Sequence, residues 1–422
     1  MAVTTAWGET LQVFMELGFP VNVFTLDSAT DGVLDEDYLD GTLVGDDVAS
    51  YVQDVRVTRG RQDQLGQFSA GTSSITLLNN DRRFDPTNES SPYWDSTLEQ
   101  SGVTPRRKVT VRLGGEDVFV GRITDIDLSY ATGKSTDLST VTVNAADDFV
   151  LLANAATTQD RTPTQEASGA RLDYLLNLPE IAYTGDTDID TGTATLGAYQ
   201  IDANTNALQY AQAIAESEQG YFFVSRDGKL TFTDRVAKIF ATSVAAFSDD
   251  DGTDIKYQTL SVMYGQEFLY NKVLATREGG TPQIANDATS QSEYGISTLN
   301  LDGLLLASDT AAQTLADALL ELYANPAYRY DGMEILVSAQ ASGTRTTLNT
   351  LELGDTITVE RNYQTGTPAQ VIKYQTVERL SRVITPNIHR LEIAMSDAFI
   401  VFPFVLDDPV RGILDDPENA LS

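Results

Sequence analysis

Short runs of β-branched and aromatic residues, each bounded by Gly, Asn, Asp or Pro, follow one another along this chain. Such runs favour strands, and the residues between them favour turns. Similar runs return after residue 326, where the chain is predicted to be all strand. The sequence therefore predicts a mainly β protein with two strand-rich parts. The clearest runs of the first part are Val52–Val57, Ile75–Leu78, Val109–Leu113, Val118–Ile126 and Val141–Val143.

Helical spacing separates the two strand-rich parts. Apolar residues recur at helical intervals in 170–178, 205–219 and 309–325, and each segment ends at a Pro or Gly signal. Between two aromatic runs, Asp-Gly predicts a two-residue hairpin in which Phe223 pairs with Phe232. The predicted fold class is mainly β with α+β insertions.

Composition narrows the possible functions. The 422 residues, 41% of them hydrophobic, can bury more than one core. A net charge of −33 repels nucleic acid, which argues against a sequence-specific DNA binder. The absence of Cys excludes disulfides and thiolate chemistry. Apolar runs are shorter than a membrane span and no basic leader is visible, so we expect no spanning segment and no signal peptide.

The charges are distributed unevenly. Residues 1–55 hold eleven acidic and no basic residues, whereas residues 56–112 hold nine basic and six acidic ones. These arginines either pair with neighbouring carboxylates on a solvated surface or face partner subunits of opposite charge. For the consecutive Arg106, Arg107 and Lys108 we predict contact with a neighbouring chain.

No catalytic or cofactor-binding residue is predicted. The only histidine, His389, alternates with Leu391 and Ile393 on one face of a strand, which favours a satisfied structural role. Nucleophile elbow, phosphate-loop and dinucleotide motifs are missing from the sequence. A carbohydrate-active β-protein that uses two carboxylates is the alternative from another class.

Three acidic segments are weak candidates for calcium loops. Asp27–Tyr38 and Asp186–Gly192 place oxygen atoms at alternating positions, but neither has the bidentate Glu at position twelve. Asp249–Asp254 is a short acidic turn. We interpret all three as exposed loops, and we predict no metal site.

Three motifs in order resemble the tail hub family of long-tailed phages, also described as baseplate hub or minor tail proteins. The first is a strand, Asn79-Asn80-Asp81-x-x-Phe84-Asp85-Pro86, then Phe119-x-Gly121-Arg122-Ile123 and Asp147-Asp148. A helix before Gly220-Tyr221-Phe222 and Ser225–Leu230 is similar to the middle of that family, and Leu351–Val359 to its second barrel. The likeness extends to the N-terminal hub part of tail-associated lysins.

The resemblance implies two tail-tube-like β-barrels, a helix-containing module and a smaller accessory module. We expect an acidic segment and the first barrel in 1–160 and an α+β module in 161–250. The second barrel is expected in 251–400, with a helical insertion near 308–325, and an extended tail in 401–422.

The resemblance also implies a structural role and no enzyme activity. In that family the hub is a homotrimer whose barrels continue the tail tube at the virion tail tip, after synthesis in the host cytoplasm. Its partners are the distal tail protein ring, the tape-measure protein and a central fibre or receptor-binding protein. An acidic lumen would let DNA pass without binding. The alternative role is the hexameric distal tail ring. Lytic or fibre domains are expected on another chain.

Overall fold

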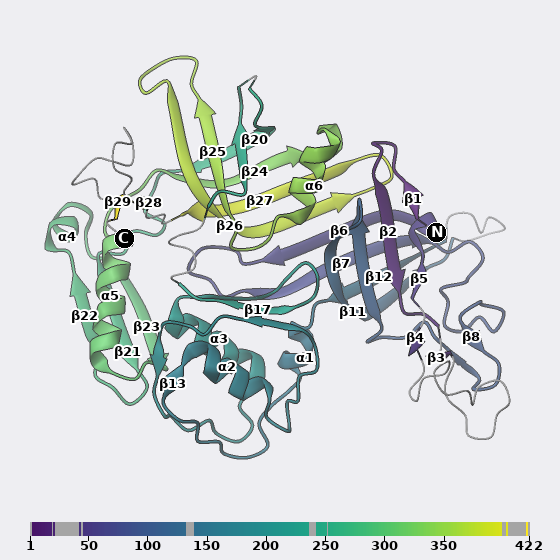
Figure 1. The fold of residues 1–422 in the computed structure, drawn as a ribbon, viewed down its shortest axis with the longest axis horizontal. Helices are drawn as coiled ribbons and strands as arrows, with labels where there is room; N and C mark the ends of the chain where they lie inside the picture. The colour runs from purple at the N-terminus through teal and green to yellow at the C-terminus, as the bar shows by residue number, and fades with distance from the viewer. Residues whose placement is uncertain are drawn as a thin grey trace.

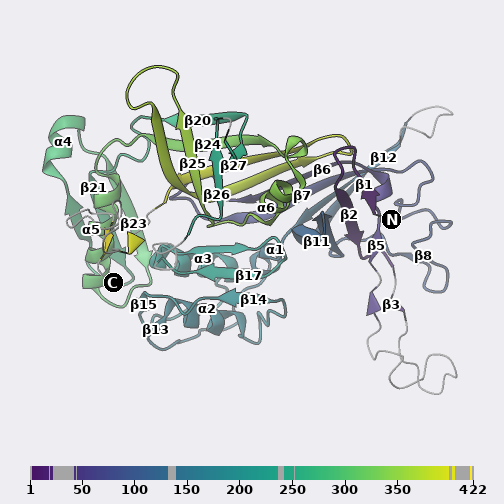
Figure 2. The same ribbon diagram turned by 45° about the horizontal axis from the view of Figure 1, so that its top comes forward.

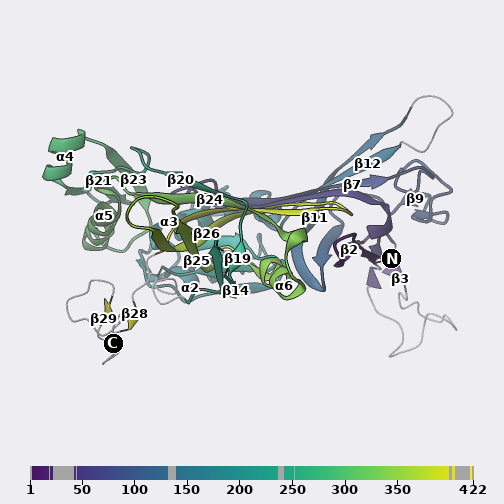
Figure 3. The same ribbon diagram turned by 90° about the horizontal axis from the view of Figure 1, so that it is seen from above.

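The computed structural model is elongated, and most of its strands belong to one large sheet (Figure 1). The first strand-rich part lies at the end that carries the N-terminus, and a small sheet with a helix lies at the opposite end (Figure 3). The structure describes residues 2–18, 20–21, 42–43, 45–131, 139–235, 242–250, 252–398, 402–403 and 419–420.

Strands of the first part bury every second residue, as expected for strands with one face on a core. In β12, for example, Val141, Val143 and Ala145 are buried and their neighbours are partly exposed. These side chains form a core of their own. The strands are β1 (Val3–Thr4), β2 (Thr10–Met15), β5 (Asp46–Asp47), β6 (Val52–Gly60), β7 (Ser69–Leu78), β10 (Lys108–Leu113), β11 (Glu116–Ser129) and β12 (Thr140–Ala146).

Smaller elements lie outside the large sheet. The short helix η1 (Ala49–Tyr51) leads into β6. Two-residue strands form isolated pairs. These are β3 (Pro20–Val21) with β4 (Thr42–Leu43), β8 (Trp94–Asp95) with β9 (Gln100–Ser101), and β28 (Phe402–Pro403) with β29 (Asn419–Ala420). The pair β28–β29 lies near α5 (Asp309–Tyr323), at the end opposite the first part (Figure 3).

The second strand-rich part follows the order β19-β18-β25-β26-β27-β24-β20. Its two end strands, β19 and β20, are consecutive in the chain, so the strand path curls back on itself. The hydrogen bonds of the described strands do not close a ring, and closure into a barrel stays a prediction. The strands are β18 (Ala245–Ser248), β19 (Ile255–Lys256), β20 (Thr259–Met263), β24 (Arg329–Leu336), β25 (Thr356–Asn362), β26 (Gln370–Ile384) and β27 (His389–Asp397).

One long strand, β26, joins the two parts. Its residues 370–376 pair with β25, and residues 379–384 pair antiparallel with β6 of the first part. Ile384, the last residue of β26, packs in the core of the first part. The two predicted barrels are therefore parts of one hydrogen-bonded sheet.

The helix-containing module lies beside this sheet (Figure 2). Its helix α3 ends with Gln219 in the left-handed conformation, directly before Gly220. It comprises α1 (Phe149–Ala153), β13 (Glu166–Ala167), α2 (Ser168–Leu176), β14 (Thr187–Ile189), β15 (Thr195–Leu196), α3 (Ala207–Glu218), β16 (Tyr221–Val224) and β17 (Leu230–Thr233). The predicted helices at 170–178 and 205–219 are thus confirmed with shifted ends.

The predicted hairpin forms, but its predicted register is wrong. Phe232 pairs with Phe222, and Phe223 pairs with Thr231. Ser225 N–H donates to the Lys229 carbonyl, and Gly228 adopts φ +89°, so three residues form the loop. The left-handed Gly places an extra residue in the turn, which shifts the pairing by one.

A three-stranded sheet covered by one helix is inserted between β20 and β24. The helix α5 (Asp309–Tyr323) confirms the helix predicted at 309–325, and its buried stripe contains Ala312, Leu315, Ala316 and Leu319. The Ser308 side chain accepts from Ala311 N–H at its start. The other elements are β21 (Lys272–Arg277), β22 (Gln283–Asn286), α4 (Ala288–Tyr294) and β23 (Thr298–Leu304).

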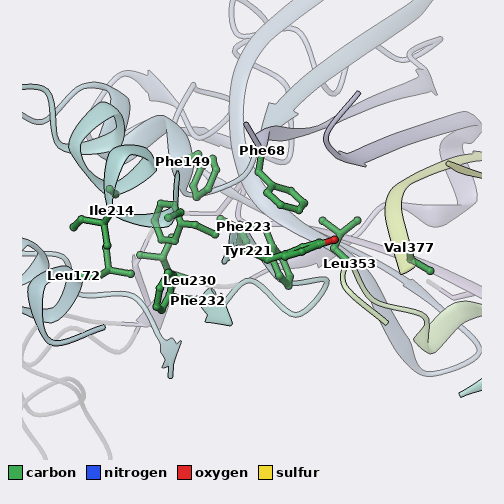
Figure 4. Close-up of a cluster of buried hydrophobic side chains, with 14 of the residues drawn as sticks. Phe68, Phe149, Leu172, Ile214, Tyr221, Phe223, Leu230, Phe232, Leu353 and Val377 are labelled. Atoms are coloured by element: carbon green, nitrogen blue, oxygen red, sulfur yellow. The ribbon is translucent and has the colours of Figure 1, made fainter. Parts of the chain in front are cut away.

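The larger core runs from the helix-containing module into the second part. In Figure 4, Phe68 from the end of the β6–β7 loop lies beside Tyr221 of β16. Leu353 and Val377 extend the same cluster toward the second part. The three regions are therefore joined by shared apolar packing as well as by strand pairing.

The mainly β prediction with α+β insertions is confirmed. The all-strand prediction after residue 326 is wrong, because η2 (Val337–Ala339) and α6 (Ser342–Thr350) lie between β24 and β25. α6 is rich in Ser and Thr, and Leu348 is its one buried apolar residue, so it has no apolar stripe in the sequence. Asp27–Tyr38 and nearly all of the predicted tail 401–422 lie outside the described residues.

Candidate subunit interface

Six of the nine basic residues in 56–112 form ion pairs inside the chain. The pairing carboxylates come from both strand-rich parts. The pairs are Arg56–Asp54, Arg59–Glu352, Arg61–Glu378, Arg82–Asp85, Arg83–Asp81 and Arg112–Asp117. Pairing within the chain is therefore correct for these six arginines, but Arg59 and Arg61 are buried and pair with distant carboxylates, so their ion pairs are not on a solvated surface.

The remaining three basic residues are Arg106, Arg107 and Lys108, at the turn that leads into β10. Arg106 and Lys108 are exposed, and Arg107 is half-buried. None of the three side chains forms an ion pair with another residue that the structure describes. These three consecutive cations, called the positive patch below, have the Glu16 carboxylate beside them, which accepts from Lys108 N–H at 3.3 Å.

The backbone fixes this patch against the neighbouring strands. Arg106 N–H donates to the Ile123 carbonyl at 2.7 Å, and Ile123 N–H donates to the Arg107 carbonyl at 2.8 Å. Arg106 has φ +69°, which turns the chain into β10. Lys108 pairs with Arg122 in the antiparallel register. The positive side chains are thus presented by an ordered turn at the edge of the core.

The Asn-Asn-Asp motif begins a loop of the first part that is held by local side-chain hydrogen bonds. Asn79 Oδ1 accepts from Phe84 N–H at 3.1 Å, and Phe84 is buried. The Asp85 carboxylate accepts from Arg82, Thr87 and Tyr130. Burial raises the pKa of Asp85, but these hydrogen bonds outweigh burial and hold its pKa well below the ordinary value. The motif therefore has a structural role, because its hydrogen bonds fix the conformation of the loop after β7.

A buried ion pair links β26 to the start of the β6–β7 loop. Glu378 accepts from Arg61 Nε, Tyr221 Oη and Ser396 Oγ, each at 2.6 Å. The Arg61 guanidinium lies over the rings of Phe68 and Tyr221, at 4.8 and 4.5 Å. All the oxygens of this buried carboxylate therefore have partners, which come from three regions of the chain.

A second polar junction surrounds Glu352. Its carboxylate accepts from Arg59 at 2.5 Å and from Arg226 N–H at 2.7 Å, and Arg59 also donates to the Val224 carbonyl. Beside it, burial raises the pKa of Asp355 to about 6. The two junctions hold the first part, the helix-containing module and the second part in a fixed arrangement.

Two of the three acidic segments considered as calcium loops lie in the described part of the chain. Thr187–Ile189 is strand β14, parallel to β17, so Asp186–Gly192 is not simply an exposed loop. Asp249 accepts from Asn362 N–H, and Asp250 accepts from Gly252 N–H. No cluster of three or more metal-ligating side chains was found in the part of the chain that the structure describes.

His389 is buried at the start of β27, on the core face predicted from its spacing. Burial and the nearby Arg382 hold its pKa well below the ordinary value. Neither ring nitrogen has a hydrogen-bond partner among the described residues, so the predicted satisfied state is not what the structure shows.

Sequence reasoning missed the partners that complete the two junctions. Glu378 and Glu352 lie far from Arg61 and Arg59 in the chain. A further acid, Glu9, is buried near α6 and was also missed. Residue type alone does not distinguish a buried acid from the many exposed ones. The signal that could have been used for Glu378 is its position between Val377 and Leu380 in a strand with many buried residues.

The fold defined by these regions is that of solved tail proteins. It is similar to a tail protein from Neisseria meningitidis MC58, with a TM-score of 0.58 and 10% identity over 92% of this chain and 96% of that chain. It is also similar to the 43 kDa tail protein of prophage MuSo2 from Shewanella oneidensis, with a TM-score of 0.53 and 12% identity over 85% and 97%. No family model and no curated protein matches the sequence.

At these identities the likeness shows a shared fold. The resemblance to phage tail proteins that the motifs indicate is confirmed at that level, over nearly the whole of the chain. Among the described residues, no helix is long and apolar enough to cross a membrane.

Proposed function

We propose that this chain is a structural protein of a viral tail and forms the hub at the tail tip. The observation that carries the proposal is the fold similarity to a tail protein over 92% of this chain and 96% of that protein. Two strand-rich parts in one chain favour the hub over the distal tail ring, which is expected to use one barrel per chain. The protein is not an enzyme in this proposal.

In the proposed assembly three copies form a ring. Each copy contributes two barrels, within 1–160 and 251–400, and the two barrels share the sheet joined by β26. The ring continues the tail tube and contacts the distal tail protein ring, the tape-measure protein and a central fibre or receptor-binding protein. With a net charge of −33, carboxylates that line the lumen would repel DNA phosphates as the genome passes.

Arg106, Arg107 and Lys108 contact the neighbouring copy in this proposal. The support is that these cations lack an ion-pair partner among the described residues, while the six other arginines of the basic segment have one. A second copy of so acidic a chain is an electrostatically suitable partner.

Location in the particle tests the proposal. An epitope tag on the chain should direct gold-labelled antibody to the tail tip of intact particles. Label along the tube, or no label on particles that carry the tagged chain, would contradict a tip hub. Purified protein should release no sugar from a cell-wall preparation, and sustained release would instead favour the carbohydrate-active alternative.

A further inference from the structure

A third polar cluster, independent of the proposed function, lies between the N-terminal loop and the second part. Trp7 and Glu9 come from the loop between β1 and β2. They meet two residues of α6 and one residue each of β26 and β27. These partners are Arg345, Asn349, Arg382 and His389.

Printed contacts place these side chains in one site. The Trp7 and His389 rings are 5.5 Å apart, and the Arg345 guanidinium lies 5.8 Å from the Trp7 ring. Glu9 Oε1 accepts from Asn349 Nδ2 at 3.1 Å and lies 3.9 Å from Arg345 Nε. Arg382 interacts electrostatically with both Glu9 and His389.

Four residues of the site are buried, whereas Trp7 and Arg345 are half-buried. Glu9 is 7% exposed, Arg382 3%, and Asn349 and His389 0%. Burial lowers the pKa of Arg382 to about 9, and the nearby Arg59 acts in the same direction. Burial also raises the pKa of Glu9, although the Asn349 hydrogen bond and Arg345 oppose the rise. These groups therefore sit in an environment of low polarity.

Unpartnered polar atoms concentrate in this site. Of twelve buried side-chain nitrogen and oxygen atoms that lack a hydrogen-bond partner in the described part of the chain, seven belong to it. Buried polar groups are nearly always hydrogen-bonded, so an accumulation of this size requires a partner. The seven atoms are Trp7 Nε1, Glu9 Oε2, Arg345 Nε, Asn349 Oδ1, Arg382 NH1 and both ring nitrogens of His389.

The chemistry of these atoms selects the ligand. Trp7, Arg345 and Arg382 offer donors, whereas Glu9 Oε2 and Asn349 Oδ1 require a donor. A neutral imidazole needs one partner of each kind. A metal ion would meet the N–H donors, and an anion would meet the Glu9 carboxylate. A ligand that both donates and accepts satisfies every atom.

We propose that this site holds a cluster of ordered water molecules that joins the N-terminal loop to α6, β26 and β27. Buried waters commonly make three hydrogen bonds to groups that otherwise lack partners. The backbone supports the same junction, because Ala6 N–H donates to the Pro386 carbonyl at 2.8 Å. The waters would complete the polar contacts between the N-terminal loop and the second part, beside the pairing of β6 with β26.

A high-resolution crystal structure of the full chain tests the site directly. We expect compact density peaks about 2.7–3.2 Å from Trp7 Nε1, Arg382 NH1 and a His389 nitrogen. Density for a metal or an anion, direct pairing of these side chains, or a site without density would overturn the proposal.

Solution NMR gives a second test that does not depend on crystals. The chain has two tryptophans and one histidine, so selective ¹⁵N labelling yields very few side-chain signals. The Trp7 indole N–H, assigned by its loss in Trp7→Phe, should show a cross-peak to long-lived water. Trp94→Phe is the control and should leave that cross-peak intact. A folded protein without the cross-peak would contradict bound water at Trp7.

Discussion

Arg61 donates to Glu378 at 2.6 Å across 317 residues of sequence, and the contact crosses the boundary between the two strand-rich parts. Both side chains are largely buried, with 11% and 3% exposed. The pair lies next to the strand pairing of β6 with β26, so one polar contact and one run of backbone hydrogen bonds hold the same boundary.

Removing one partner of this pair should destabilise the protein strongly. Arg61→Met leaves the Glu378 charge buried with only Tyr221 and Ser396 as donors, and we expect a loss of about 3 kcal/mol in unfolding free energy. Urea unfolding measures it. Arg56→Met is the matched control, because the Arg56 side chain is 68% exposed and its ion pair contributes below about 1 kcal/mol. Equal losses in both variants would contradict the assigned role.

The hydrogen bonds of the Asp85 carboxylate should make the unfolding free energy of the protein fall in acid. The folded-state pKa of Asp85 lies below the unfolded value of 3.8, so its contribution is present above that value and is lost as pH falls through the folded pKa. Asp85→Asn should cost about 1–3 kcal/mol at pH 7 through the unsatisfied donors. The difference between wild type and variant in thermal unfolding should shrink below pH 4. A difference independent of pH would show that Asp85 is not ionised in the fold.

Asp147 should have the opposite pH dependence. Burial raises its pKa to about 7, against the Gly71 and Phe149 N–H groups that it accepts from. Between the unfolded value of 3.8 and about 7 the folded state retains a proton that the unfolded state has lost, so stability declines as pH rises.

Asp147→Asn isolates this effect. The stability of the variant relative to wild type should rise with pH from about 4 to about 7 and level off above. Melting curves across this range measure it. A constant difference would contradict the raised pKa.

Charge reversal tests the proposed subunit contact. Arg106→Glu with Arg107→Glu should weaken the proposed trimer, because like charges would then face an acidic neighbour. Native mass spectrometry should show more monomer than for wild type. Lys229→Glu with Arg390→Glu changes the net charge equally at two exposed cations that have partners within the chain. If both double variants assemble like wild type, the patch is not in the contact.

Much of the fold could be predicted from local patterns. The strand at Val141–Val143 and the helix around Leu315 and Leu319 have apolar residues at regular intervals. They could therefore be predicted from hydrophobic periodicity. The hairpin register could not be predicted, because a left-handed Gly228 adds a residue to the turn. α6 was missed, because its helix lacks an apolar stripe.

The site was predictable only in part. The three consecutive cations Arg106, Arg107 and Lys108 can be recognised in the sequence. Their lack of ion-pair partners could not be predicted, because it depends on where distant carboxylates lie. The flanking Val377 and Leu380 are a local signal for the burial of Glu378, but its partner Arg61 is set by the pairing of strands far apart in the chain. Long-range contacts of this kind leave no local pattern.

A reconstruction of the intact particle tests the tail-tip account most directly. We expect three copies of this chain at the tip of the tail, with the β6–β26 sheet in the ring and Arg106 to Lys108 against the neighbouring copy. Six copies in a ring above the tip, or a particle whose tip lacks the chain, would contradict it.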